Sequence, residues 1–255
     1  MIKVEHLYKS FKLDSQRQKM LGIKEKELLA LSDISFSADA GKVLLLLGTK
    51  NAGKSTLLHI LGGAAQPDKG TVHILGMDLA TKSAEIRRLV GYLSSGQPFF
   101  NYLSVTEQLE YAARAKGLAP ALLRDSLPNL LENWQLATVA KRKVATLSET
   151  ERLHLGIAQA LVHQPRLLLL DEPTLGLDIF TAQPIINLVN YAKSNGIGVV
   201  FGTNNISKAE LLGDELLILH KGQVLHQSSM VDFKENLATG SPAAEFLRII
   251  VESKE

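Results

Sequence analysis

Cysteine is absent from the 255 residues of this chain, and its absence excludes disulfides and cysteine-based metal sites. Long apolar runs are also absent: the longest, such as residues 43–47 and 167–170, fall far short of the ~20 residues that a membrane-spanning helix needs. The net charge is only +2 and includes no long basic block, so binding to nucleic acid is not expected. Residues 1–5 lack the pattern of a signal peptide. We therefore expect a cytosolic protein that reaches a membrane only through a partner.

A glycine-bearing loop follows the apolar residues 43–47 and leads into an amphipathic stretch at residues 57–61. The pattern G-x-x-x-x-G-K-[ST] between a buried strand and a helix is that of a phosphate-binding P-loop. We expect its backbone N–H groups and the positive end of the helix to bind polyphosphate. Lys54 would reach the β- and γ-phosphates, and the Ser55 hydroxyl would ligate Mg²⁺. The predicted nucleotide-binding residues of this loop are Gly48, Thr49, Lys50, Asn51, Ala52, Gly53, Lys54, Ser55 and Thr56.

A second apolar run, residues 167–170, ends in Asp171 and Glu172, about 115 residues after the P-loop. A buried strand that carries an aspartate to the metal is the second element that a P-loop enzyme requires. Asp171 is therefore a predicted Mg²⁺ ligand, and Glu172 can orient or deprotonate the attacking water. The two motifs together predict Mg²⁺ and a nucleoside triphosphate as ligands.

Strand and helix patterns alternate along most of the chain, which is typical of a mainly parallel sheet with its ligand at the carboxyl ends of the strands. Residues 2–7 and 31–37 alternate as half-buried strands do, and residues 12–27 between them predict a solvated loop or a short exposed helix. Capping boxes that begin at Ser104 and Ser148 predict the starts of two helices. We expect an ATP-binding domain at residues 1–227, a helical lobe inserted at about residues 96–162, and a helical tail at residues 228–255.

The motifs together resemble those of the ATP-binding subunits of ABC transporters, and the resemblance extends from Ile2 to about Gln227. It implies an α/β P-loop NTPase fold with an antiparallel β subdomain. It also implies that Phe11 stacks on adenine and that Asp178 lies in a loop crossing between two ATP-binding domains. In this family each ATP is held by the P-loop of one domain and the signature motif of the other, in which Ser148 is the serine of this chain.

The implied ligand is ATP with Mg²⁺, and the implied partners are a membrane permease subunit and a second ATP-binding domain, in the same or a different chain. Nucleic acid is not among them. The charged segment before Leu28 is most similar to that of ABC-2-type exporters. The resemblance thus predicts a peripheral protein at the cytoplasmic face of a membrane.

The signature motif departs from the family pattern. Leu-Ser-Gly-Gly-Gln is replaced by Leu-Ser-Glu-Thr-Glu at residues 147–151. Glu149 and Glu151 favour the helix through its dipole, and Glu151 can close the capping box. The same two carboxylates would repel a triphosphate. We therefore expect a stable helix start and an impaired phosphate sensor.

Two further positions also depart from the pattern. The switch histidine is replaced by Asn204, which can donate a hydrogen bond but carries no charge. The glutamine expected after the strand at residues 90–93 is replaced by Ser95, with Gln97 two residues later, and both are candidate metal-site residues. The neighbouring Phe99 and Phe100 are compatible either with burial or with an exposed surface that docks a permease.

The sequence favours an ATP-binding and ATP-hydrolysing subunit that powers a separate permease, with Lys54, Glu172 and Asn204 as its catalytic residues. An exporter is the expected transporter, and the changed signature suggests that the second ATP-binding domain is a different polypeptide. The alternative is a nucleotide-binding regulatory or structural module with little hydrolysis of its own. An ABC ATPase acting on DNA or ribosomes is disfavoured, because the chain has neither long coiled coils nor a second fused ATP-binding domain.

Overall fold

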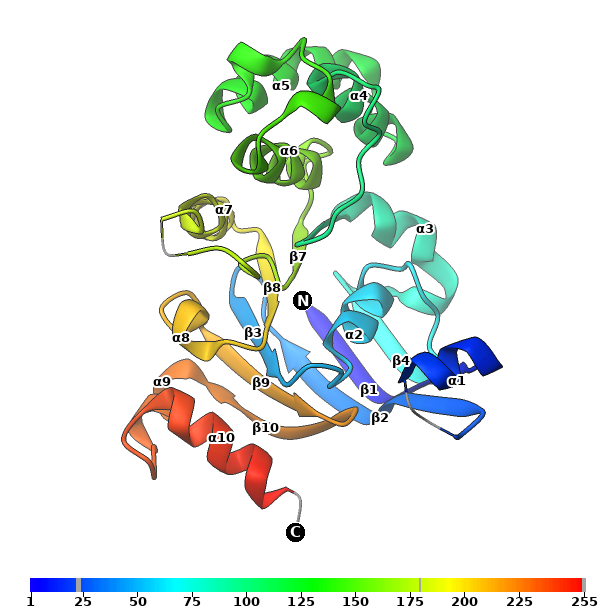
Figure 1. Ribbon diagram of the computed structural model, residues 1–255, viewed down its shortest axis with the longest axis vertical. Helices are drawn as coiled ribbons and strands as arrows, with labels where there is room; N and C mark the ends of the chain where they lie inside the picture. The colour runs from blue at the N-terminus through cyan, green and yellow to red at the C-terminus, as the bar shows by residue number, and fades with distance from the viewer. Residues whose placement is uncertain (22–23, 179, 254–255) are drawn as a thin grey trace.

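The computed structural model describes residues 1–21, 24–178 and 180–253, and it contains two β-sheets with helices packed around them (Figure 1). The larger sheet has six strands in the order β10-β9-β3-β8-β7-β6. The smaller sheet has four strands in the order β2-β1-β4-β5, and its pairs are antiparallel. The expected α/β P-loop fold with an antiparallel subdomain is confirmed.

The larger sheet is parallel except at one edge. Strands β3 (Val43–Gly48), β7 (Leu167–Asp171) and β8 (Gly198–Thr203) are buried at every position, as near-continuous apolar runs covered on both faces should be. Strands β6 (Val90–Ser94) and β9 (Glu215–His220) extend the parallel part of the sheet on either side. Strand β10 (Gln223–Ser229) closes one edge by pairing antiparallel to β9. The carboxyl ends of the parallel strands therefore meet at one edge, where Gly48 and Asp171 both lie.

Successive residues of β3 belong to two different cores, because side chains alternate between the faces of a strand. Leu44 and Leu46 pack with helix α2 (Lys54–Leu61) and the smaller sheet. Leu45 and Leu47 pack in a second core that includes residues of the helical lobe and of the C-terminal helices. The larger sheet thus separates two apolar cores, and the P-loop helix belongs to the first.

The first hairpin is longer than expected. Strands β1 (Ile2–Lys12) and β2 (Glu27–Ala38) pair along most of their length, so Phe11 lies within a strand opposite Leu28. Main-chain pairing extends the hairpin beyond its half-buried part into exposed residues. Alternation of apolar and polar side chains does not detect this extension, because neither face of it is buried. Helix α1 (Ser15–Leu21) occupies part of the charged segment. Strands β4 (Lys69–Ile74) and β5 (Met77–Asp78) complete the smaller sheet, and α3 (Leu79–Leu89) follows them.

The helical lobe lies at one end of the molecule, and its α6 packs against β6 of the larger sheet (Figure 1). Its main helices are α4 (Val105–Ala115), α5 (Pro120–Asn133) and α6 (Glu149–Leu161), with short 3₁₀ helices at Ala137–Val139 and Val144–Thr146. Both predicted capping boxes are confirmed: the Ser104 and Ser148 hydroxyls each accept a hydrogen bond from the backbone three residues later, and Glu107 and Glu151 reciprocate.

The remaining helices are α7 (Gln183–Ser194), α8 (Ile206–Ala209), α9 (Met230–Glu235) and α10 (Pro242–Glu252). Helix α10 lies beside β10 and α8 (Figure 1), and its buried Phe246 and Ile250 join the same core as the lobe. Residue 228, where the tail was expected to begin, is within β10. In the described part of the chain, no helix is both long enough and apolar enough to cross a bilayer.

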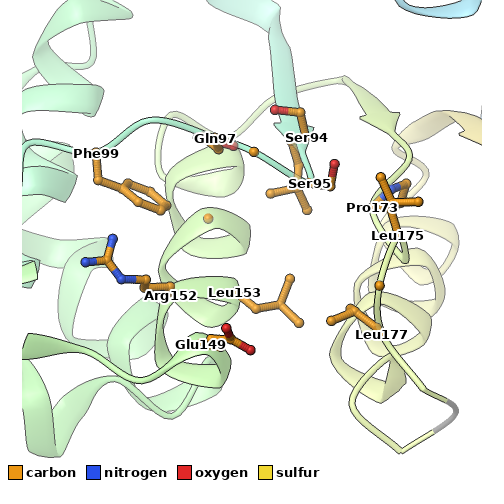
Figure 2. Close-up of a pocket in the computed structure, with 14 residues that line it drawn as sticks. Ser94, Ser95, Gln97, Phe99, Glu149, Arg152, Leu153, Pro173, Leu175 and Leu177 are labelled. Atoms are coloured by element: carbon orange, nitrogen blue, oxygen red, sulfur yellow. The ribbon is translucent and has the colours of Figure 1, made fainter. Parts of the chain in front are cut away.

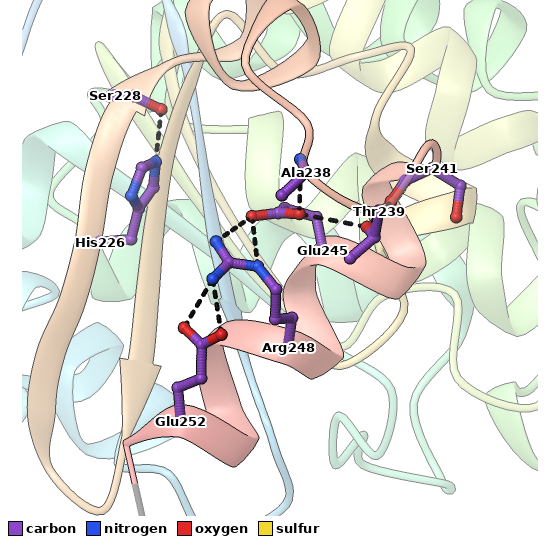
Figure 3. Close-up of polar contacts among 8 residues, drawn as sticks. All are labelled: His226, Ser228, Ala238, Thr239, Ser241, Glu245, Arg248 and Glu252. Atoms are coloured by element: carbon purple, nitrogen blue, oxygen red, sulfur yellow. Dashed lines mark hydrogen bonds and ion pairs between the residues drawn. The ribbon is translucent and has the colours of Figure 1, made fainter.

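A buried carboxylate anchors the start of α10 (Figure 3). Glu245 is 4% exposed and accepts hydrogen bonds from the Ala238 amide (3.0 Å) and the Thr239 hydroxyl (3.1 Å). The Arg248 guanidinium donates to it from Nε at 3.0 Å and also pairs with Glu252. Arg248, by this hydrogen bond, lowers the pKa of Glu245. Because each partner of the buried charge is supplied locally, the loop before α10 and the helix form one unit.

Candidate nucleotide-binding site

The P-loop connects β3 to α2 and needs two of its glycines for separate reasons. A Cβ at Gly48 would lie 2.4 Å from the Leu219 carbonyl oxygen of the neighbouring strand. Gly53 has φ 103°, a conformation that favours glycine, and a Cβ there would lie 2.6 Å from the Ala30 carbonyl oxygen. Asn51 adopts φ 63°, which asparagine tolerates better than most residues. The loop therefore has the tight backbone that phosphate binding requires.

Lys54 lies inside this loop and is 6% exposed. Its Nζ donates to the carbonyl oxygens of Gly48 at 2.8 Å and Thr49 at 3.1 Å. The same nitrogen lies 3.1 Å from Glu172 Oε1 at the end of β7. The side chain is thus oriented by the loop toward the carboxylate expected to activate water. A phosphate entering the loop would compete with Glu172 for this ammonium group.

Asp171 and Glu172 leave β7 in different environments. Asp171 is 8% exposed, and its Oδ2 accepts a 3.0 Å hydrogen bond from the Tyr92 hydroxyl. Among the described residues, none donates a hydrogen bond to the buried Oδ1. Asp171 and Ser55 line the same cavity of about 670 Å³. A buried carboxylate oxygen without a donor, in the same cavity as a serine hydroxyl, fits the oxygen-only preference of Mg²⁺.

Glu172 has an unusual backbone, with φ 47°. Its N–H donates to the Gly202 carbonyl oxygen at 2.9 Å, and its Oε2 accepts a 3.2 Å hydrogen bond from the Asn204 amide. Left-handed backbone outside glycine costs on the order of 1 kcal/mol and is often found at functional sites. Asn204 therefore contacts the site through its main-chain N–H, although Asn204 as a whole is exposed to solvent.

A second cavity of about 470 Å³ adjoins the P-loop on the side of the first hairpin. Phe11 and Leu28 line one part of it, and Asn51 to Thr56 line the other. Phe11 is 37% exposed, and the Lys9 ammonium lies 5.4 Å from its ring centroid. An aromatic surface is therefore contiguous with the phosphate loop, as binding of a base requires. Lys50 is exposed.

Ser148 and Asp178 do not line either of these cavities. The Asp178 carboxylate accepts hydrogen bonds from Phe180 N at 2.9 Å and Thr181 N at 2.8 Å, so it stabilises its own turn. Their neighbours Glu149 and Leu177 line a third cavity, of about 430 Å³, between α6 and the chain after β7 (Figure 2). The fold thus brings together the P-loop, Asp171, Glu172 and the Asn204 main chain. The signature motif and Asp178 lie outside this group of residues, near the third cavity.

The start of α6, which carries the signature motif, binds the carboxylate of its own residue Glu151. Ser148 N donates to Glu151 Oε2 at 2.7 Å, and Glu151 N donates to Ser148 Oγ at 3.2 Å. Arg142 pairs with Glu151 Oε1 at 3.0 Å and also donates to the Thr146 carbonyl oxygen. The Ser148 backbone hydrogen bond is the main cause of the lowered pKa of Glu151. A main-chain donor at the anion-binding end of α6 is therefore already occupied.

The two candidate metal-site residues of the segment after β6, Ser95 and Gln97, lie in different environments. Ser95 is exposed, and its N–H donates to the Asp171 carbonyl oxygen at 3.3 Å. Gln97 lines the cavities on both sides of this segment, and in the described residues no donor reaches its buried Oε1. Of the two, Gln97 has the side chain that faces the cavity shared by Ser55 and Asp171.

Two contacts at the site were not predicted. Tyr92 binds Asp171, and His220 Nδ1 lies 3.3 Å from the Thr49 hydroxyl of the P-loop. The signal for each is strand pairing: β6 lies beside β7, and β9 lies beside β3 with Leu219 opposite Gly48. Both residues occur near the carboxyl ends of predicted strands, but only the strand order identifies their neighbours.

The cavity of about 670 Å³ forms a groove between the sheet and the lobe, lined by Phe100 and Tyr111. These two aromatic residues and Tyr102 are exposed and contact one another: the Phe100 ring centroid lies 4.9 Å from that of Tyr111 and 5.8 Å from that of Tyr102. Phe100 is 39% exposed, whereas Phe99 packs against the core of the lobe. At the other side, Lys116 Nζ donates to the carbonyl oxygens of Arg87 and Val90, and burial lowers its pKa.

His163 at this groove makes stability depend on pH. Burial, with a smaller contribution from Lys116, lowers its pKa from 6.5 to about 4. Between these pH values the unfolded chain binds a proton that the folded chain does not, so stability is complete above pH 6.5 and falls as the pH is lowered. Urea unfolding of the wild type should lose about 2 kcal/mol more between pH 7.5 and 5 than unfolding of His163→Gln. An equal loss in both proteins would contradict this assignment.

This chain is similar to proteins of known family. A family described as ABC transporter matches residues 31–175. The ABC transporter ATP-binding protein NatA of Bacillus subtilis is 27% identical over 232 residues, which cover 91% of this chain and 92% of NatA. The doxorubicin resistance ATP-binding protein DrrA of Mycobacterium tuberculosis is 33% identical over 208 residues, which cover 82% of this chain and 63% of DrrA. A solved structure of an ATP binding subunit of an ABC transporter has a TM-score of 0.80 and 26% identity, covering 100% of both chains.

Proposed function

Because this chain belongs to the ABC transporter family of ATP-binding domains, we propose that it binds Mg-ATP and hydrolyses it to power a separate membrane permease. The observation that carries the proposal is the position of Lys54, held by P-loop carbonyls and 3.1 Å from the Glu172 carboxylate. An ammonium group, a carboxylate and a phosphate-sized loop in one place are the parts that phosphoryl transfer to water needs.

The site residues take the following proposed roles. The P-loop amides and Lys54 bind the β- and γ-phosphates, and Phe11 stacks on the base. Ser55 and Asp171 hold Mg²⁺, with Gln97 as the candidate third group; the cation, when bound, neutralises charge on the phosphates. Glu172 orients and deprotonates the attacking water. Asn204 keeps the Glu172 carboxylate in place through its main-chain N–H.

A second ATP-binding domain would complete the site, and we propose that it is a different polypeptide. Two copies of this chain would each offer Ser148 with its amide already bound to Glu151, and Glu149 beside it. A partner with glycines in its signature would bind the γ-phosphate held by this chain without that repulsion. Purifying the native complex tests the idea, and a complex with two copies of this chain and no second ATPase would contradict it.

The permease is proposed to dock in the groove between the sheet and the lobe, at the aromatic residues Phe100, Tyr102 and Tyr111. Their exposure favours a partner surface, because clustered exposed aromatics are typical of interfaces. This arrangement would keep the chain at the cytoplasmic face of the membrane. An exporter is the proposed transporter; the name of the relative DrrA refers to doxorubicin resistance, which agrees with it.

Tyr111→Arg should weaken association with the permease at least tenfold, because interface aromatics commonly contribute about 2 kcal/mol or more. Tyr111 is 53% exposed, so the fold should be unaffected. Co-purification in detergent from cells that express the whole transporter measures the effect. Leu122→Arg, which is equally exposed on α5, is the matched control. Retention of the permease by Tyr111→Arg would argue against docking in this groove.

The nucleotide part of the proposal is tested by calorimetric titration of the wild-type chain with ATP, with and without Mg²⁺, and by phosphate release. Absence of binding would contradict it. The runner-up is a regulatory or structural module that holds ATP with little hydrolysis. The uncharged Asn204 and the occupied Ser148 amide favour that reading, whereas the position of Glu172 beside Lys54 favours hydrolysis.

A further inference from the structure

Among the described residues, hydrogen bonds hold Asp171 through only one of its two carboxylate oxygens. The Tyr92 hydroxyl donates to Oδ2 at 3.0 Å, while the buried Oδ1 accepts no hydrogen bond from any described residue. A buried carboxylate oxygen without a donor is costly unless a cation or water satisfies it. The asymmetry therefore divides the carboxylate into one oxygen that is fixed by the protein and one that is left for a ligand.

The strand register explains why Tyr92 reaches Asp171. In the parallel pair β6–β7, Tyr92 lies opposite Leu169 and Ser94 lies opposite Asp171. Residues two apart on a strand share a face, so Tyr92 is the diagonal neighbour of Asp171 on the same side of the sheet. A diagonal separation can be spanned by an aromatic side chain. The phenol ring bridges it, and its hydroxyl forms the hydrogen bond.

A residue of α2, the helix that follows the P-loop, packs against the Tyr92 ring. His59 of α2 lies 5.5 Å from the Tyr92 ring, between centroids. Ser55 is one helical turn before His59, so both side chains lie along the same side of α2. Ser55, His59, Tyr92 and Asp171 all line the cavity of about 670 Å³. The candidate metal-binding hydroxyl, the ring support and the candidate metal-binding carboxylate therefore meet in one space.

We infer that Tyr92 is a positioning residue for the divalent cation of the nucleotide site: its hydroxyl fixes Asp171 Oδ2 and leaves Oδ1 for the cation. The inference rests on the proposed function, because the cation is that of Mg-ATP. Tyr92 does not touch the cation in this account. It acts through Asp171, as hydrogen-bonding groups behind metal ligands generally do, and their loss typically weakens metal binding about 10–100-fold.

Tyr92→Phe is the sharpest test, since it removes the hydroxyl and keeps the ring that packs against His59. Each protein is first bound to a non-hydrolysable ATP analogue, and its affinity for Mn²⁺ is then measured by electron paramagnetic resonance. The Mn²⁺ affinity of Tyr92→Phe should be at least about tenfold weaker than that of the wild type. Binding of the analogue in EDTA should be unchanged, because the P-loop is intact. Tyr191→Phe is the matched control: this tyrosine packs its ring on Trp134, outside the nucleotide site.

The outcomes separate the inference from the proposed function. A wild type that binds neither analogue nor Mn²⁺ would overturn both. A wild type that binds both, together with a Tyr92→Phe protein of equal Mn²⁺ affinity and unchanged melting temperature, would overturn the inference and leave the proposed function standing. Weaker analogue binding in EDTA would also overturn it, because the change would then act on the loop and not on the cation.

Discussion

Replacing Glu172 with glutamine is expected to lower the rate of Mg-ATP hydrolysis about 10²–10⁴-fold, the range for loss of a general base. Glutamine has the same shape and can still accept the Asn204 N–H, but it cannot take a proton from water. It also removes the charge that faces Lys54 at 3.1 Å. With that competitor gone, Lys54 is available to phosphate, so ATP binding should be retained or become tighter.

The measurement is phosphate release by wild type and Glu172→Gln, after both have been shown to bind ATP. Glu252→Gln is the control for charge, because this glutamate pairs with Arg248 on α10, away from the nucleotide site. If the isolated wild type turns over well above the variant, two copies of this chain hydrolyse ATP despite Asn204 and the altered signature, and the proposed different partner is not required. Equal, near-zero rates of the isolated proteins with binding preserved agree with a partner-dependent half of a transporter or with a nucleotide sensor. The two proteins are then compared in the complete transporter, where the loss is expected for the partner-dependent half and not for the sensor.

Restoring the signature glycines should raise hydrolysis by the isolated chain about 10²-fold. The variant combines Glu149→Gly, Thr150→Gly and Glu151→Gln. Two charges about 6 Å apart repel by roughly 2–3 kcal/mol at an effective dielectric constant near 20, and the wild type has two such carboxylates. The variant also replaces the charged acceptor of the Ser148 amide, now 2.7 Å away, with the neutral amide oxygen of a glutamine. Weaker capping should lower the stability of α6 by about 1 kcal/mol.

Steady-state hydrolysis at protein concentrations that permit dimerisation measures this gain. A second variant, Glu149→Gln with Glu151→Gln, removes the charges and keeps the side chains. It therefore distinguishes repulsion of the triphosphate by the carboxylates from the closer backbone approach to the phosphate that glycines allow. If the glycine variant dimerises on ATP and hydrolyses it no faster than the wild type, the signature is not what limits turnover.

The placement of the candidate site residues that are contiguous in sequence could be predicted, because a P-loop and the end of a buried strand each specify local geometry. Lys54, Ser55, Asp171 and Glu172 are predicted in this way, and the structure places Ser55 with Asp171 in one cavity and Lys54 beside Glu172. The same holds for the capping boxes at Ser104 and Ser148, whose partners lie three residues away.

The contacts that depend on strand order could not be predicted. Tyr92 reaches Asp171 across a strand pair, and His220 reaches Thr49 across another. The left-handed backbone of Glu172 also has no local signal, and its N–H bonds to Gly202 on β8, a residue 30 positions later in the chain. Similarly, the length of the first hairpin is set by main-chain pairing through exposed residues, which leaves no mark on apolar periodicity.

The alternation of β3 between two cores has a consequence for how the protein tolerates change. Leu45 and Leu46 are adjacent in the chain, yet they pack against different sets of helices on opposite faces of the sheet. Because these side chains have no packing partners in common, substitutions at the two positions are coupled only through the backbone of the strand that they share. Neighbouring positions can therefore vary without compensating for each other. The packing of the lobe and tail can be redesigned while that beneath the P-loop helix stays as it is.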